Sequence, residues 1–217
     1  MRYFTFSNNI NIDNQQIKTV LHLTRPRLAL FSNFLSSNEC DELIDLARPK
    51  MQRSHVINPI GEGTIEDNAR TSNGMFFQRQ ANELVSKIET RISKLLDIPL
   101  DHGEGIQILN YHIGGEYKPH HDYFKPNEKG EQPYIKIGGQ RIATLLMYLN
   151  YVEEGGTTIF PTLGVEFMPI KGSALFFYYE LEDNDVDIHS LHGGSPVNIG
   201  QKWVATKWLR QNPYYNK

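Results

Sequence analysis

Cysteine is almost absent from this sequence. Cys40 is the single cysteine among 217 residues. An intramolecular disulfide framework is therefore excluded, and so is a zinc or iron–sulfur site built from several thiolates. Any metal site must use nitrogen and oxygen ligands, which eight histidines and 25 Asp and Glu residues can supply.

Long apolar runs and an excess of one charge are also missing. No stretch of about 18 apolar residues occurs, so we expect no membrane-spanning helix. Residues 1–16 lack the apolar stretch of a signal peptide, which favours a cytoplasmic protein. The net charge of −3 gives little support to a nucleic-acid partner, because domains that bind phosphate backbones are usually strongly basic.

The length suits one domain with a full hydrophobic core. Residues 1–27 are polar and rich in Asn and Gln, which predicts an edge strand or a loosely packed N-terminal arm. An exposed arm would make a homodimer conceivable. Residues 28–217 contain no repeat and no low-complexity linker, so we expect one catalytic or binding domain there.

Two helices are expected in the first half of the chain. Ser36 and Glu39 match a capping box, in which each side chain bonds the other residue's backbone N–H, and Pro49 ends the helical pattern. Cys40 lies on the apolar face of this helix, where we expect it to be a small buried residue. A second apolar stripe predicts a helix over about 80–97. The polar stretch 58–74 between them predicts a long loop, a type that is often functional.

Short apolar and β-branched runs, separated by Gly and Pro, fill the second half. They predict an α+β fold with an antiparallel barrel or jelly roll and helices packed outside it. The expected strands cover residues 28–31, 106–111, 117–124, 141–149, 157–160, 174–179, 189–192 and 203–209.

The densest cluster of possible metal ligands is Lys118 to Phe124. Because alternate residues of a strand share a face, His120 and Asp122 would point one way and His121 the other. A second histidine would complete a two-His, one-carboxylate site of the kind that binds Fe(II) and leaves positions open. The His-x-Asp pattern alone also occurs by chance. We prefer His192 over His189 as the third ligand, because two glycines follow His192 and allow close approach.

Lys202 begins the last expected strand, ten residues after His192. A lysine that faces the interior of a barrel needs an anionic partner, and a bound carboxylate would provide it. Periodicity alone leaves open that Lys202 faces solvent at the start of the strand.

These residues, with the motifs around them, resemble the prolyl 4-hydroxylases among the Fe(II)- and 2-oxoglutarate-dependent dioxygenases, and in particular their small, free-standing bacterial members. The resemblance spans about residues 28–210. Its motifs are Asn110-Tyr111, Tyr117-x-x-His120-x-Asp122-Tyr123-Phe124, Arg141-Ile142-Ala143-Thr144, Met147-Tyr148-Leu149-Asn150, Glu154-Gly155-Gly156-x-Thr158-x-Phe160-Pro161 and Leu191-His192-Gly193-Gly194-x-Pro196-Val197.

The resemblance implies a double-stranded β-helix, or jelly-roll, core and a role for nine residues. Iron would be held by His120, Asp122 and His192. The distal carboxylate of 2-oxoglutarate would pair with Lys202, in a pocket lined by Thr158 and Tyr111. The peptide substrate would lie near Tyr117, Arg141 and Trp208. Residues 125–140 depart from the family pattern and could reshape the substrate entrance.

The implied reaction converts peptidyl proline to 4-hydroxyproline with O2 and 2-oxoglutarate, releases succinate and CO2, and uses ascorbate as a further cofactor. Alternatives are hydroxylation of another side chain or of a free amino acid, or a metal- or peptide-binding barrel without turnover. A nucleic-acid demethylase would share the metal ligands. The retained ligands together with Lys202 argue against a barrel that only binds.

Overall fold

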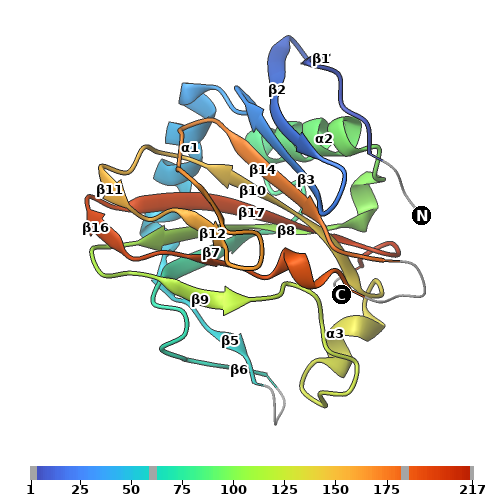
Figure 1. The fold of residues 1–217 in the computed structure, drawn as a ribbon, viewed down its shortest axis with the longest axis vertical. Helices are drawn as coiled ribbons and strands as arrows, with labels where there is room; N and C mark the ends of the chain where they lie inside the picture. The colour runs from blue at the N-terminus through green and yellow to red at the C-terminus, as the bar shows by residue number, and fades with distance from the viewer. Residues whose placement is uncertain (1–3, 59–62, 182–185, 216–217) are drawn as a thin grey trace.

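The computed structural model describes residues 4–58, 63–181 and 186–215, and its body is a large antiparallel sheet (Figure 1). The sheet has nine strands within these residues. In spatial order they are β1 (Asn9–Ile12), β2 (Gln15–Leu23), β3 (Arg27–Ser32), β14 (Ala174–Tyr178), β10 (Arg141–Tyr148), β17 (Lys202–Arg210), β8 (Gly103–Tyr111), β7 (Asn73–Phe77) and β4 (Gln52–Arg53).

A smaller sheet packs against one face of the large sheet. It consists of β13 (Val165–Phe167), β12 (Thr158–Phe160), β15 (His192–Gly194) and β9 (Tyr117–His120). Phe160 and Phe167 of the small sheet share an apolar cluster with Leu109, Phe177 and Val204 of the large one. Two short pairs complete the strands: β11 (Glu154–Gly155) with β16 (Val197–Ile199), and β5 (Val56–Ile57) with β6 (Thr64–Ile65).

The two longer helices cover the other face of the large sheet, behind it in Figure 1. In α1 (Ser37–Ala47) the predicted capping box of Ser36 and Glu39 is present. In α2 (Glu83–Leu96) Asn82 is the N-cap, so the helix begins later than the predicted 80. The short helices are η1 (Arg48–Lys50), η2 (Leu100–His102), α3 (Gln132–Lys136) and η4 (Ile188–Ser190).

Two packed sheets with helices on one outer face confirm the predicted α+β jelly-roll fold. Strand β17 shows how the layers determine burial, since all nine of its residues are buried. Trp203 and Ala205 pack under the helices, while Val204 joins the cluster between the sheets. Because side chains alternate along a strand, Lys202 and Trp208 share the face of Val204.

The structure corrects several predicted boundaries. The strand predicted over 117–124 ends at His120, and the one predicted over 189–192 begins as the helix η4. The predicted loop 58–74 contains β6 and the start of β7, and residues 59–62 of it lie outside the described residues. The stretch 125–140 contains α3, a short helix that no apolar periodicity in the sequence predicts.

The N-terminal region forms edge strands, one of its two predicted alternatives. β1 pairs with β2, and β2 pairs with β3, so residues from Asn9 onward extend the large sheet. Phe4 and Phe6 pack against Phe176 of β14, which fastens the segment to the core. No helix among the described residues is both long enough and apolar enough to cross a membrane.

Candidate active site

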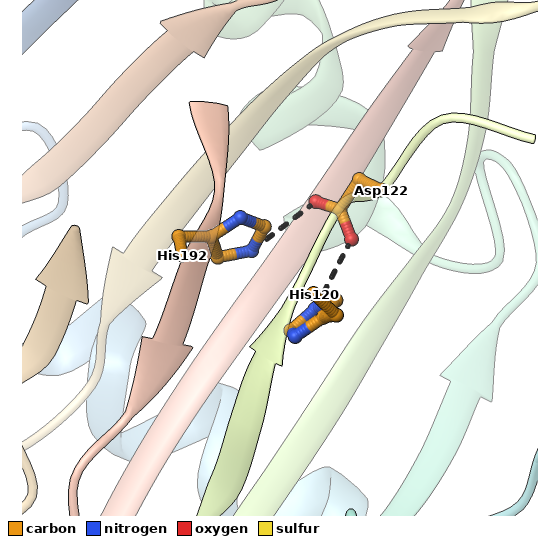
Figure 2. A group of neighbouring side chains, drawn as sticks. All are labelled: His120, Asp122 and His192. Carbon is orange, nitrogen blue, oxygen red and sulfur yellow. Dashed lines mark ion pairs between the residues drawn. The ribbon is translucent and has the colours of Figure 1, made fainter. Parts of the chain in front are cut away.

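Strand register brings the two histidines of the predicted metal site together. β9 and β15 are antiparallel neighbours, and His120 is the direct cross-strand partner of His192. Asp122 lies two residues beyond the end of β9, with its carboxylate between the two imidazoles (Figure 2). His120 Nε2 is 3.5 Å from Asp122 Oδ1, and His192 Nε2 is 3.6 Å from Asp122 Oδ2.

The glycine that follows His192 allows this pairing. A Cβ atom on Gly193 would lie 2.8 Å from the carbonyl oxygen of Tyr117 and 3.1 Å from the nitrogen of Pro119. Any side chain at this position would therefore push β15 away from β9. This close approach of two backbones is the role that the sequence assigned to the glycines after His192.

Backbone carbonyls determine the tautomers of both imidazoles. His120 Nδ1 lies 2.9 Å from the carbonyl oxygen of Lys118, and His192 Nδ1 lies 3.0 Å from that of Ser190. A carbonyl oxygen only accepts, so each Nδ1 carries a proton, and Nε2 is the ring nitrogen that faces Asp122 and would bind a metal. This outer contact is the usual arrangement around a histidine that binds a metal.

Asp122 is held as a carboxylate. Its Oδ2 accepts a 2.6 Å hydrogen bond from the hydroxyl of Thr144. Burial raises the pKa of Asp122, but the neighbouring His192, His120 and Arg141 outweigh burial and hold this pKa well below its ordinary value. The side chain is therefore charged and oriented.

Aromatic rings fix the two histidines from the side. The ring of Tyr117 stacks on His120 with centroids 3.6 Å apart, and the ring centroids of Phe177 and His192 are 4.6 Å apart.

Burial lowers the pKa of His192 to about 4, so its imidazole is neutral and can act as a ligand. Among the described residues, these two histidines and Asp122 form the one group able to hold a metal ion, with all ligand atoms within 4.8 Å of one another.

Lys202 is buried between the sheets and lines the same pocket as the three metal-ligand candidates. Its Nζ atom is 3.5 Å from the carbonyl oxygen of Thr157, and no carboxylate among the described residues pairs with it. Burial lowers the pKa of Lys202 to about 7. Of the two alternatives left by periodicity, the structure therefore shows the inward-facing one.

Tyr111 and Thr158, which the resemblance assigns to the 2-oxoglutarate pocket, line the same pocket as Lys202. Tyr111 is the cross-strand partner of Lys202, and its ring centroid is 5.8 Å from Nζ. The hydroxyl of Thr158 accepts a 2.8 Å hydrogen bond from that of Tyr148, which leaves the Thr158 proton free to donate. Tyr148 is a buried pocket neighbour to which the sequence gave no role.

A cleft of about 1220 Å³ opens beside His120 and Asp122. Tyr117, Arg141 and Trp208, the three residues predicted on the substrate side, all line it. Burial raises the pKa of Tyr117 to about 12, so its phenol is a proton donor. The buried indole N–H of Trp208 has no hydrogen-bond partner among the described residues.

Arg141 also has partners within the protein. Its Nε and Nη2 atoms donate to the two carboxylate oxygens of Glu104 at 2.7 and 2.9 Å, and Nη1 donates to the backbone oxygen of Asp122 at 3.3 Å. Its guanidinium stacks 3.8 Å above the ring of Trp208. Arg141 thus holds Asp122 and Trp208 in place, and its position beside the peptide substrate stays a prediction.

Comparison with known proteins agrees with this geometry. Residues 106–210 match the family model described as the 2OG-Fe(II) oxygenase superfamily. Prolyl 4-hydroxylase 5 of Arabidopsis thaliana is 40% identical over 208 residues, which cover 87% of this chain and 70% of the plant protein. The chain belongs to the prolyl 4-hydroxylase family. A second member from Arabidopsis thaliana, prolyl 4-hydroxylase 1, is 40% identical over 202 residues and covers 86% of this chain and 69% of its own length.

Solved structures of prolyl hydroxylases share the fold. The viral collagen prolyl hydroxylase of Paramecium bursaria Chlorella virus-1, solved as a 2OG complex, superposes with a TM-score of 0.67 at 30% identity and covers 84% of this chain and 95% of its own. The prolyl 4-hydroxylase of Pseudomonas putida gives a TM-score of 0.55 at 17% identity and covers 85% of this chain and 92% of its own, a likeness of fold alone.

Sequence reasoning missed three residues that support the site. Thr144 and Glu104 hold Asp122 and Arg141, and Arg210 donates from Nη1 to Glu104 and from Nη2 to the backbone oxygens of Tyr134 and Ile137. Thr144 belongs to the family motif Arg141-Ile142-Ala143-Thr144, which could have indicated its role. Glu104 and Arg210 are separated by 106 positions, and no local pattern connects them.

Proposed function

We propose that the protein hydroxylates proline residues of peptides at C4, using Fe(II), 2-oxoglutarate and O2. The observation that carries the proposal is one pocket lined by His120, Asp122 and His192 and also by Lys202, which no carboxylate among the described residues pairs with. The family supports the choice of chemistry, and the long cleft beside the pocket supports a peptide substrate.

The three ligand candidates fit an iron site. Two neutral imidazoles and one carboxylate on one side of an ion are the donor set of non-haem Fe(II) oxygenases, in which open positions remain for other ligands. Fe(II), when bound, supplies the oxygen activation that no side chain can perform. The chain's own part is to present Nε2 of both imidazoles and to keep Asp122 charged and fixed through Thr144.

The buried ammonium of Lys202 fits one carboxylate of 2-oxoglutarate. A buried, unpaired charge costs several kcal/mol, and a bound carboxylate would remove that cost. The Thr158 hydroxyl has a proton left to donate to the same anion, and Tyr111 and Leu109 close the walls against water. The cosubstrate would then be held in one orientation, with its other end toward His120 and His192.

Tyr117 and Trp208 are suited to hold the peptide. Each offers an aromatic face beside the metal ligands, and each carries a polar hydrogen, in Trp208 one without a partner among the described residues. A flat apolar ring fits a proline ring, while the N–H and O–H groups fit carbonyl oxygens of an extended peptide. A free amino acid would leave most of the 1220 Å³ cleft empty, which favours a peptide over free proline.

Ascorbate, a homodimer and a cytoplasmic location stay predictions. Ascorbate would act as the reductant that keeps iron in the Fe(II) state during unproductive turnover. The number of turnovers with and without ascorbate tests the role of ascorbate. Light scattering tests the homodimer, and cell fractionation tests the cytoplasmic location.

A panel of proline-containing peptides tests the proposed function. The purified chain would be incubated with Fe(II), 2-oxoglutarate, ascorbate and each peptide, and products analysed by mass spectrometry. We expect one added oxygen atom on proline, located at C4 by comparison with 3- and 4-hydroxyproline standards. Oxygen added to another residue would support the alternative of another hydroxylase, and iron binding without any product would support a binding barrel.

A further inference from the structure

The cleft extends well beyond the metal ligands and has a basic end. Strand β4 forms the edge of the large sheet and pairs with β7. Lys50 precedes β4, Arg53 lies within it, and Arg79 follows β7, and all three line the cleft. We call these three residues the basic rim.

Within the described part of the chain, no carboxylate neutralises the basic rim. Arg53 donates to the backbone oxygen of Ser72 at 3.3 Å, and Arg79 donates to the backbone oxygen of Asp101 at 3.1 Å. Lys50 is exposed and has no hydrogen bond or ion pair among the described residues. The three positive charges therefore line the cleft without an ion pair among the described residues.

Four carboxylates also line the cleft, and among the described residues none of them forms an ion pair with the basic rim. Each accepts a hydrogen bond from within the protein: Glu104 from Arg141 and Arg210, Asp122 from Thr144, Glu131 from the backbone N–H of Lys125, and Asp101 from the Tyr215 hydroxyl. Of these four, Glu104 is paired with two arginines and Asp122 lies between the two metal-ligand histidines, so the basic rim is a local cluster of three positive charges within the cleft.

We propose that the basic rim selects peptides that carry Asp or Glu residues a few positions from the target proline. The proposal rests on the proposed function and names the substrate class within it. Charges that line a concave surface focus the electric field, and complementary charge raises association rates and specificity more than it raises final affinity. Acidic flanks would be attracted to Lys50, Arg53 and Arg79 while the proline reaches the pocket.

Three peptides of equal length that differ only in their flanking residues test the proposal. One carries Glu, one Gln and one Lys on both sides of a central proline. At an ionic strength of about 0.02 M we expect kcat/KM to fall in the order Glu, Gln, Lys, with a total range of roughly tenfold. The range should shrink to about twofold at roughly 0.5 M salt, because salt screens exposed charges.

The variant Lys50→Glu tests whether the peptide preference comes from the basic rim or from the overall charge of the protein. We expect this variant to lose most of the preference for the Glu peptide and to gain activity on the Lys peptide. The matched control is Lys18→Glu, which makes the same change on an exposed residue of β2, outside the cleft. This control should keep the preference of the unaltered protein.

Equal kcat/KM for the Glu and Lys peptides would overturn the basic-rim proposal while leaving proline hydroxylation intact. If none of the peptides is hydroxylated, the proposed function fails, and binding of fluorescent Glu and Lys peptides still tests the rim. Equal binding of the two, or the same response in Lys50→Glu and Lys18→Glu, would then contradict the rim.

Discussion

His120 and His192 are direct partners in the antiparallel pair of β9 and β15, although 72 positions separate them. Because residues opposite each other in such a pair place their side chains on the same face, the register itself builds two-thirds of the metal site. Asp122 joins from the first residues after β9, and the rest of the fold holds this arrangement.

Replacement of His192 by Ala should abolish tight metal binding. The site would lose one of three ligands, and Asp122 would keep only His120 beside it. Calorimetry with Mn(II), which replaces Fe(II) without oxidation, measures the affinity. His121→Ala is the matched control, since His121 turns toward the Ser190 hydroxyl at 3.2 Å and lies outside the ligand group. Equal losses in both variants would contradict the assignment.

Thr144→Val should weaken metal binding without removing a ligand. The Thr144 hydroxyl donates the 2.6 Å hydrogen bond that orients Asp122. Loss of such an outer contact typically costs about 10–100-fold in metal affinity, which the same Mn(II) titration would detect. Thr90→Val, which removes a hydroxyl bonded to Ser86 on α2, serves as the control. An unchanged affinity in Thr144→Val would show that Asp122 needs no such support.

Binding of 2-oxoglutarate should weaken as the pH rises above 7. Burial lowers the pKa of Lys202 to about 7, so above this pH the free amine is mostly neutral and must take up a proton to pair with a carboxylate. The Kd should therefore rise by up to about tenfold per pH unit. Calorimetry of the Mn(II) form across pH 6–9 measures this change. Lys202→Arg keeps a charge that does not titrate, and whatever affinity it retains should be independent of pH.

The lowered pKa of Lys202 should make the ligand-free protein more stable as pH rises, whereas it weakens 2-oxoglutarate binding. Its folded pKa lies below the ordinary 10.5, so the unfolded chain binds more protons between these values. The contribution of Lys202 to the free energy of unfolding therefore becomes more favourable as pH rises from about 7 toward 10. Lys202→Met should raise the stability of the ligand-free protein at pH 6, and it should abolish the stabilisation by 2-oxoglutarate. Urea unfolding at pH 6 with and without the ligand tests both.

The buried pair of Lys207 and Glu89 should be stabilising only as a pair. Lys207 Nζ lies 2.5 Å from Glu89 Oε1 and also bonds the backbone oxygen of Glu104, while Glu89 Oε2 accepts from the backbone N–H of Gln80. Lys207→Met alone leaves a buried carboxylate unpaired and should cost about 3–5 kcal/mol. The double variant Glu89→Leu/Lys207→Met should recover most of this cost in urea unfolding. Additive losses would show that the pair does not act as a unit.

The sequence was sufficient for those parts of the fold and site that depend on local patterns. The capping box of Ser36 and the apolar stripe of α2 depend on neighbouring residues, so both helices were predictable. His120 and Asp122 were found because residues two apart in the sequence lie close together in any fold, although Asp122 falls just beyond the end of β9. Lys202 was found because the family motif places it, and its burial had to come from the structure.

Contacts between segments that lie far apart in the sequence could not be predicted, because no local pattern connects the residues involved. Strand register across β9 and β15 depends on the packing of two sheets, and the sequence offered His189 as an alternative to His192. Arg210 connects Glu104 with backbone oxygens of α3 and of its C-cap Ile137. The sequence of α3 has no apolar periodicity, so neither this helix nor its contact with Arg210 was predictable. The contact of Arg141 with Glu104 likewise joins residues 37 positions apart and has no local pattern.

The ratio of succinate to hydroxyproline tests the central claim most directly. The unaltered protein, His192→Ala and His121→Ala would each be given Fe(II), 2-oxoglutarate and an acidic proline peptide, and both products counted in the same reaction. We predict close to one peptidyl 4-hydroxyproline per succinate for the unaltered protein and none of either product for His192→Ala, with His121→Ala retaining the unaltered ratio. Succinate release that is independent of peptide, or hydroxyproline formed by His192→Ala, would contradict the account.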